Sequence, residues 1–334
     1  GTLFEKYLNP FFIKIVTHII PWRILQELFV GEYGVITLGI RYAVALILPI
    51  VTFFFIVFSI IEDTGYLPRL AMLIDRTFKK IGLSGRAVIP MVLGFGCATM
   101  ATMVTRTLPT KRERIIATML LSLAIPCSAQ MGVILALLEG NPKAMLIWAG
   151  IVGLIFLFVG YLTSKILPGE RPSFYMEVPP LGIPSVSNVI TKTFARVKWY
   201  FIEILPLFLL ASIFIWLGML LHIFDFIVGL LKKPVELIGL PSEASTAFLF
   251  GFFRRDYGAA GLYDLNKHGL LNGVQLVVSC VALTLFLPCI AQFLMNIKER
   301  GWKTGIGISV FVLFFSFTVA YIVNFVLTRL GIIL

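Results

Sequence analysis

Three of the four cysteines stand beside residues that interrupt helices. Cys97 follows a Gly-Phe-Gly run, and Cys127 and Cys289 each directly follow a proline, all within otherwise apolar stretches. Glycine weakens a continuous helix and proline removes a helix donor, and a broken backbone inside a membrane is tolerated only where it is buried in protein or lines a polar cavity. The breaks are therefore predicted to line a transport site, with a close helix crossing as the alternative. The residues that we place at these breaks are Gly94, Gly96, Pro126, Gly251 and Pro288.

The chemistry that these residue types allow is metal binding. Thiolates suit soft or borderline metal ions, and carbonyls freed one turn before each proline can complete the ligand set. A glutamine follows both Cys127 and Cys289 by three residues, on nearly the same helix face. For a single cysteine or methionine the alternative is packing, to which we assign Cys280 because it is out of phase with Cys289. The predicted metal ligands are Cys97, Cys127, Cys289, Met100, Gln130 and Gln292.

A second broken stretch carries charge instead of sulfur. Residues 251–258 read Gly-Phe-Phe-Arg-Arg-Asp-Tyr-Gly, and an ionisable residue at membrane depth is a functional candidate by default. We expect Asp256 to neutralise Arg254 or Arg255 in the protein interior. A direct role of Asp256 with the substrate is the alternative.

The composition indicates a protein that crosses a membrane several times. Of 334 residues, 59% are hydrophobic and 13% are charged, and the mean hydropathy is +0.97. Soluble domains are about half apolar and about a quarter charged. We assign the net charge of +11 to basic cytoplasmic loops and expect no nucleic-acid partner. Because the sequence contains no Walker A, HExxH or GxSxG motif, we expect no enzyme activity, no GTP binding and no prosthetic group in this chain.

Hydropathy predicts an all-α protein whose spans alternate with amphipathic helices. Spans of about the ~20 residues that a bilayer requires are interrupted by amphipathic segments at 67–81 and 223–238. The predicted spans are 42–61, 115–138, 144–167, 200–221, 270–297 and 306–327. The predicted domains are an interfacial, extracytoplasmic segment at 1–41, a first repeat at 42–167, a cytoplasmic connector at 168–198 and a second repeat at 199–334.

The second half of the chain repeats the first at a constant offset. Ile81-Gly82-Leu83 and Gly94-Phe95 recur 157 residues later as Ile238-Gly239-Leu240 and Gly251-Phe252. The Pro-Cys-x-Ala-Gln run at 126–130 recurs at 288–292, an offset of 162. Paired, interrupted hydrophobic segments in matching places point to the binding site of a transporter.

Loop charges predict that the two repeats are inverted. Residues 62–86 and 106–114 are strongly basic, so both flanks of the first broken element are expected in the cytoplasm, which makes that element a re-entrant hairpin. The nearly neutral turn at 139–143 then lies outside, and the second broken element enters from outside. The two hairpins are therefore expected on opposite sides of the membrane.

Over roughly residues 30–334 the sequence resembles the ferrous iron transport protein B family. The resemblance implies Fe²⁺ as the transported substrate, carried by a multi-pass protein into the cytoplasm across the cytoplasmic (inner) membrane of a prokaryote through two gate repeats. It also implies that the three break cysteines handle the metal. The motifs that carry the resemblance are Glu62-Asp63-Thr64-Gly65-Tyr66, Asp75-Arg76, Ile81-Gly82-Leu83, Gly94-Phe95-Gly96-Cys97, Thr105-Arg106-Thr107-Leu108, Pro126-Cys127-Ser128-Ala129, Arg254-Arg255-Asp256-Tyr257-Gly258-Ala259-Ala260-Gly261 and Pro288-Cys289.

The sequence departs from this family pattern in two respects. Family members usually begin with a cytoplasmic GTPase domain and a first membrane helix, so we expect this chain to be a piece of a longer protein. The expected partners are then a GTP-binding domain from that missing region, small cytoplasmic accessory proteins and the lipid bilayer. The second repeat also has Arg254 where the first has Cys97, so the metal site cannot be symmetric.

The favoured function is an Fe²⁺ permease in which the thiols act in turn. Three thiolates at once would hold the ion too tightly for release, and metal binding should weaken as pH falls because a thiol must lose its proton. One alternative is a gate-fold carrier of an organic solute such as a nucleoside, coupled to Na⁺ or H⁺. That carrier should have Asn, Gln, Glu and Ser at both breaks, whereas the breaks here carry Cys, Thr and Met in one and Arg-Arg-Asp in the other. A membrane scaffold or sensor that transports nothing is a third class.

Overall fold

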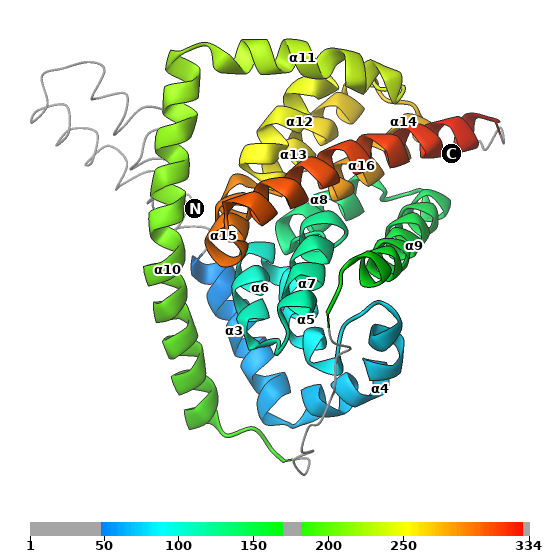
Figure 1. The fold of residues 1–334 in the computed structure, drawn as a ribbon. Coiled ribbons are helices and arrows are strands. Elements are labelled where there is room, and N and C mark those ends of the chain that lie inside the picture. The colour runs from blue at the N-terminus through cyan, green and yellow to red at the C-terminus, as the bar shows by residue number, and fades with distance from the viewer. Residues whose placement is uncertain (1–47, 170–181, 287, 330–334) are drawn as a thin grey trace, which may run out of the picture. The chain divides into compact units, whose positions relative to one another are not determined.

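The regular structure of the described residues is helical throughout. The computed structural model describes residues 48–169, 182–286 and 288–329, and no strand occurs among them (Figure 1). Four helical segments of this part are long and apolar enough to cross a membrane, or up to six if each of two bent helix pairs is one span. The expected all-α, multi-pass architecture is confirmed. The predicted segment 1–41, the start of the first span at 42–47 and connector residues 170–181 lie outside the described residues.

The chain divides into two compact units. Among the described residues, one contains residues 48–66 and 182–224, and the other contains residues 67–169, 225–286 and 288–329. In its described part, the first unit is built around α3 (Leu48–Asp63) and α10 (Val186–Leu220). The second unit contains both broken elements and all four cysteines.

Helix α10 begins earlier than the hydropathy predicts. Its first residue is Val186, whereas the span was expected to start at residue 200. The polar residues of this first part pair with the end of α3: Arg196 Nη2 lies 2.5 Å from Glu62 Oε2, and Lys192 Nζ lies 3.2 Å from Asp63 Oδ1. Because these charges are neutralised within the unit, a segment expected to be a polar connector continues the helix.

The helices of the second unit follow the predicted repeat. The first repeat contributes α4 (Tyr66–Lys80), α5 (Val88–Gly96), α6 (Ala98–Val104), α7 (Lys111–Leu123), α8 (Ser128–Leu137) and α9 (Pro142–Ile166), with short 3₁₀ turns at Gly85–Ala87 and Thr105–Thr107. The second repeat contributes α11 (Ile223–Leu237), α12 (Ala244–Phe253), α13 (Arg255–Lys267), α14 (Gly273–Leu285), α15 (Ile290–Arg300) and α16 (Trp302–Arg329). The amphipathic segments expected at 67–81 and 223–238 are α4 and α11.

Matching glycines end α4 and α11 in the same way. Gly82 has φ +77° and Gly239 has φ +82°, a left-handed conformation that glycine adopts without a steric penalty. After each glycine a leucine N–H donates back five residues, from Leu83 to Phe78 O (2.9 Å) and from Leu240 to Val235 O (3.2 Å). The 157-residue offset is therefore a structural equivalence at these helix ends.

Helices α7 and α14 both begin with a capping box. Thr110 Oγ1 accepts the N–H of Glu113 (3.1 Å), whose fully buried carboxylate accepts the N–H of Ser84 (2.8 Å). In the second repeat, Gln275 accepts the N–H of Asn272 (2.9 Å) and donates to Gly239 O (2.7 Å). Such capping boxes satisfy backbone N–H groups that the first turn of a helix leaves unpaired. Each also fixes the start of a broken span against the preceding helix end.

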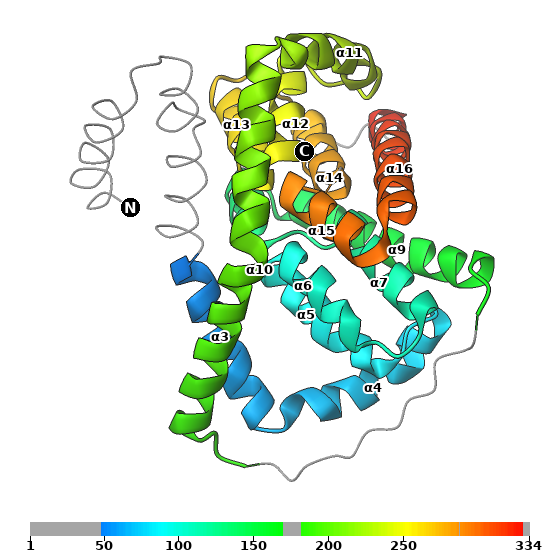
Figure 2. The same cartoon turned by 60° about the vertical axis from the view of Figure 1, so that its left-hand side comes forward.

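Each broken element folds back on itself as a helical hairpin. Helix α5 packs against α6, and α12 packs against α13 (Figure 2). The second hairpin depends on small residues, because a Cβ added at Gly258 would lie 2.6 Å from Gly251 Cα and 2.8 Å from Ala247 O. Gly94 and Gly251 lie inside α5 and α12, where an added Cβ would meet Leu121 (2.6 Å) and Leu283 (3.2 Å), respectively.

The two repeats pack into each other reciprocally. Helix α6 of the first repeat packs on α15 of the second, and α13 of the second repeat packs on α8 of the first. Helix α9 packs on α14, and α16 packs on α7. This exchange of partners is the pattern that a two-fold relation between the repeats would produce.

Candidate functional site

The residue at each helix break caps the N-terminus of the helix that follows. Cys97 (φ −150°, ψ 114°) precedes α6, and Arg254 (φ −148°, ψ 122°) precedes α13 in nearly the same conformation. Cys127 precedes α8 and Cys289 precedes α15. The sequence repeat therefore places three cysteines and one arginine at two pairs of equivalent backbone positions, Cys97 with Arg254 and Cys127 with Cys289.

The structure brings the three break cysteines into one region. Ser128 Oγ donates to Gly96 O (3.1 Å) and so joins the break before α6 to the break before α8. The charges of Cys97 and Cys127 would each act on Cys289 and on each other. All three side chains are partly exposed, whereas Cys280 is fully buried in α14, as expected for packing.

These thiols do not form a closed metal cage. Within the described residues, no group of three or more His, Cys, Asp or Glu side chains is placed to hold a metal ion. Met100 lies buried in α6, at 3% exposure. Any metal ligand set in this region must therefore draw on amide and carbonyl oxygens as well as sulfur.

The two predicted glutamine ligands are fully buried and join the repeats. Gln130 Nε2 donates to Leu283 O of α14 (2.9 Å), and Gln292 Nε2 donates to Ser122 Oγ of α7 (3.3 Å). Their Oε1 atoms have no hydrogen-bond partner in the described part of the chain. Burial of an amide oxygen without a hydrogen-bond partner is unfavourable, and a bound cation would remove that cost. The Oε1 atoms of Gln130 and Gln292 are therefore available as cation ligands.

Asn296 is a further member of this cluster that the sequence reasoning missed. It is fully buried one turn after Gln292, donates to Ser122 Oγ (3.0 Å), and has an unpaired Oδ1 among the residues described. The sequence feature that could have identified Asn296 is its place one helical turn after Gln292, as a polar residue in an apolar span.

The two arginines of the second break have different partners. Arg254 Nε and Nη2 bind Asp256 at 3.1 and 2.5 Å, so the expected neutralisation by Asp256 is confirmed for Arg254. Arg255 is 4% exposed and donates to backbone carbonyls instead, from Nη1 to Ile125 O (3.1 Å) and from Nη2 to Ser122 O (2.8 Å). Arg255 thus binds the carbonyls that are left without a helix donor before Pro126. The sequence had predicted Asp256 as a possible partner of Arg255.

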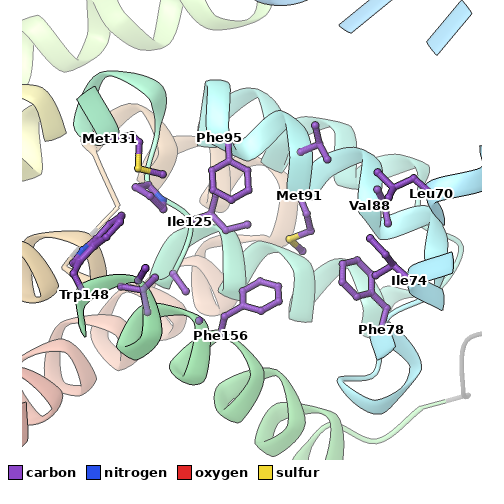
Figure 3. A pocket seen from close by; sticks show the side chains of 16 residues that line it. Leu70, Ile74, Phe78, Val88, Met91, Phe95, Ile125, Met131, Trp148 and Phe156 are labelled. Carbon is purple, nitrogen blue, oxygen red and sulfur yellow. The ribbon is translucent and has the colours of Figure 1, made fainter. Parts of the chain in front are cut away.

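An apolar cavity of about 460 Å³ opens beside the first hairpin (Figure 3). Its walls come from α4, α5, α8 and α9 and include Phe78, Met91, Phe95, Trp148 and Phe156. A pocket with these side chains offers no set of hydrogen-bonding groups for a polar solute and no charged ligand for a metal ion.

Comparison with family models identifies both repeats separately. The Gate model, described as nucleoside recognition, matches residues 44–140 and again residues 201–303, which reproduces the repeat offset. The model of the ferrous iron transport protein B C terminus matches residues 145–196. No solved structure is significantly similar to this chain.

Curated relatives named as Fe(2+) transporters match this chain, two of them over almost its whole length. The Fe(2+) transporter FeoB of Methanocaldococcus jannaschii is 27% identical over 98% of this chain and 53% of the relative. That of Staphylococcus aureus is 27% identical over 94% of this chain and 50% of the relative. An Fe(2+) transport protein A/Fe(2+) transporter FeoB fusion protein of Porphyromonas gingivalis is 35% identical over 52% of this chain and 21% of the relative. The chain spans about half the length of the first two relatives, and it belongs to the ferrous iron transport protein B family.

Proposed function

We propose that this chain is the membrane module that moves Fe²⁺ into the cytoplasm across the cytoplasmic membrane of a prokaryote. The relatives that cover nearly all of it are named Fe(2+) transporters and come from bacteria and an archaeon. In this proposal Fe²⁺ is the cargo, and the module itself carries out no catalysis.

The observation that carries this proposal is the meeting of Cys97, Cys127 and Cys289 at three helix breaks. Each break offers a thiol, and together with backbone and amide oxygens the thiols make a mixed ligand set that suits a borderline divalent ion. The carbonyls before Pro126 are the exception, because Arg255 binds them. The absence of a closed three-ligand cage among the described residues supports weak, successive binding, which conduction requires. The buried amide oxygens of Gln130 and Gln292 complete the ligand set as the ion passes.

We also propose that the repeats are inverted across the membrane, with their hairpins on opposite sides. The reciprocal packing of α6 on α15 and of α13 on α8 supports a two-fold relation between them. Inverted repeats place paired broken helices at the bilayer midplane, where transporters bind their substrates.

A carrier of an organic solute is the alternative, because the Gate model is described as nucleoside recognition. Recognition of a nucleoside requires converging hydrogen-bond donors and acceptors in a pocket. Here the second break holds Arg254 paired to Asp256, and the cavity beside the first hairpin is lined by apolar side chains. These observations favour the metal.

The proposed partners follow from the relatives. They are about twice as long as this chain, and we infer that a GTP-binding domain acts with this module in the longer protein. The relative that is a fusion with Fe(2+) transport protein A supports a small accessory protein as a second partner.

The proposal is tested by uptake of Fe²⁺ into proteoliposomes that contain the full-length protein, under anaerobic conditions. Cys97→Ser and at least one of Cys127→Ser and Cys289→Ser should greatly reduce uptake, because each removes a thiol from the pathway. Cys280→Ser is the matched control and should transport normally, since Cys280 is buried in packing. Uptake of a labelled nucleoside without uptake of Fe²⁺, or loss confined to Cys280→Ser, would contradict the proposal.

A further inference from the structure

A stripe of polar side chains follows one face of α15. Gln292, Asn296 and Arg300 are spaced by four residues and so share one face of the helix, and the first two are fully buried. Helix α15 packs on α6 and α7, which belong to the first repeat and to the same compact unit. The first repeat therefore supplies the side chains that face this stripe.

The facing helices are polar along the same line. Ser122 Oγ on α7 accepts hydrogen bonds from Gln292 Nε2 (3.3 Å) and Asn296 Nδ2 (3.0 Å). Arg300 Nε donates to Thr118 Oγ1, one turn earlier on α7 (3.0 Å), and Arg300 Nη2 donates to Thr105 Oγ1, directly after α6. We call this set of polar residues the α15 seam, and its members are Thr102, Thr105, Thr118, Ser122, Gln292, Asn296 and Arg300.

Three oxygen atoms of the α15 seam are buried without a protein partner. Gln292 Oε1, Asn296 Oδ1 and Thr102 Oγ1 form no hydrogen bond with any residue that the structure describes, and all three side chains are fully buried. Burial of an unpaired polar group is unfavourable, and water satisfies such groups by making about 2–4 hydrogen bonds in a polar cavity. The seam therefore suits water molecules and the oxygen ligands of a hydrated divalent cation.

The matching crossing between the repeats is apolar. There α8 packs on α13 and α14, as α15 packs on α6 and α7. The side chains at the corresponding positions are all at most 2% exposed. Counted with the repeat offsets of 162 and 157, they are Ile134 for Asn296, Leu138 for Arg300, Ala259 for Thr102 and Leu262 for Thr105. Because the same helix crossing forms with apolar side chains, packing alone does not require the polar seam.

Arg300 occupies one end of the α15 seam. Its guanidinium donates to the hydroxyls of Thr105 and Thr118, while the neighbouring carboxylate of Glu299 pairs with Arg106 instead (2.5 Å). The charge of Arg106 also acts on Arg300 and opposes its own. A cation held by two neutral hydroxyls beside a like charge is easier to displace than one in a buried ion pair.

We propose that the α15 seam is a hydrated route by which the ion leaves toward the cytoplasm, and that Arg300 closes its end. The end with Arg300 lies beside the basic residues 106–114, the flank expected in the cytoplasm. In the closed arrangement the guanidinium takes the place of a cation between two hydroxyls, and an arriving ion repels it. This inference rests on the proposed Fe²⁺ transport and on the proposed topology.

Access of water to the seam is measured with single cysteines in a full-length protein that lacks the native thiols. Asn296→Cys should react with a small, water-soluble methanethiosulfonate at least about tenfold faster than Ile134→Cys, because reaction of a buried thiol scales with the population of the open form. Ile134→Cys is the matched control at the same point of the apolar crossing. Equal rates at the two positions would overturn the hydrated seam.

The role of Arg300 is tested in the same assay. Arg300→Gln, added to Asn296→Cys, should raise the rate of modification at least about tenfold, because it removes the charged group that fills the end of the seam. Lys303→Gln, which removes an exposed charge at the start of α16, is the control and should leave the rate unchanged. An unchanged rate in Arg300→Gln would overturn the closure.

Transport separates the route from the function. In the otherwise unchanged full-length protein, Asn296→Ile copies the apolar crossing and should reduce uptake of Fe²⁺ into proteoliposomes at least about tenfold, because an apolar constriction excludes water. Leu294→Ile on the same helix is the control and should transport normally. Thermal unfolding checks that each variant is folded, and the uptake comparison decides the question if a cysteine variant does not fold. Normal uptake by Asn296→Ile refutes only the route. Fast labelling that depends on Arg300, without Fe²⁺ uptake by the unchanged protein, supports the seam and refutes the transport function.

Discussion

At the scale of single residues, Arg254 and Arg255 show how adjacent charges take different roles. Arg254 is neutralised by Asp256 two residues later, and its guanidinium carbon lies 4.5 Å from the centre of the Tyr257 ring. Arg255 satisfies Ser122 and Ile125 across the repeat boundary. A buried guanidinium is stable only when its charge and its donors find acceptors. Arg254 therefore interacts locally at the start of α13, whereas Arg255 holds the second repeat against the first.

The thiols predict a pH dependence for the binding of Fe²⁺. A protonated thiol must release its proton when the ion binds, so the apparent affinity should fall as pH falls, by up to about tenfold per pH unit for each proton released. Dialysis of the full-length protein against Fe²⁺ at several near-neutral pH values measures this slope. Cys289→Ser should have a shallower slope than the unchanged protein. An affinity that does not vary with pH would mean that oxygen atoms alone bind the ion.

At the scale of elements, the two helical hairpins are the parts that position the site. Each consists of two short helices joined at one extended residue, Cys97 or Arg254, and the second hairpin is packed through small residues. The first helix of each hairpin also approaches the next long helix of its own repeat through a glycine, Gly94 against Leu121 and Gly251 against Leu283. Glycine is needed here for close approach of backbone and side chain.

The second hairpin should be sensitive to any added side-chain atom at Gly258. Gly258→Ala would place a Cβ 2.6 Å from Gly251 Cα, which is backbone and cannot rotate away, so we expect a loss of about 1–3 kcal/mol in stability. Thermal unfolding in detergent measures the loss. Gly150→Ala in α9 is the matched control, because nothing lies within 4 Å of its added Cβ. Equal unfolding midpoints for both variants would show that the close contact does not matter.

At the scale of the whole molecule, contacts between the repeats decide what the second unit can do. Gln130 and Arg255 each bind a helix end of the opposite repeat, and Arg106 binds Glu299 through two nitrogens (Nε–Oε1 2.9 Å). Each of these links joins an element of the first repeat to an element of the second. Movement of one repeat against the other would have to break them, so they are the contacts on which gating would act.

The inverted arrangement predicts the side from which each flank reacts. Lys111→Cys and Asp264→Cys, both at exposed positions, are labelled in a variant that lacks the native thiols. A membrane-impermeant maleimide added to intact cells should label Asp264→Cys from outside, whereas Lys111→Cys should react only after the membrane is opened. Asn141→Cys in the predicted outer turn is the control and should react like Asp264→Cys. Labelling of positions 111 and 264 from one side would exclude inversion.

The sequence alone determined the membrane class, the repeat and the positions of the helix breaks. These features depend on local properties, namely runs of apolar residues, glycine and proline interruptions, and a fixed offset that places Cys97 opposite Arg254. The break at Cys97 follows from local backbone preferences, because glycines directly precede it.

Only the tertiary structure decided which of these residues meet. The carbonyl partners of Arg255, the contact of Gln130 with α14 and the place of Asn296 all join residues more than 100 positions apart. The early start of α10 likewise depends on its ion pairs with α3. Local sequence can leave a carbonyl without a helix donor or place an amide in an apolar span. The hydrogen-bond partner of that group lies on another helix, so the packing of the helices determines which residue it is.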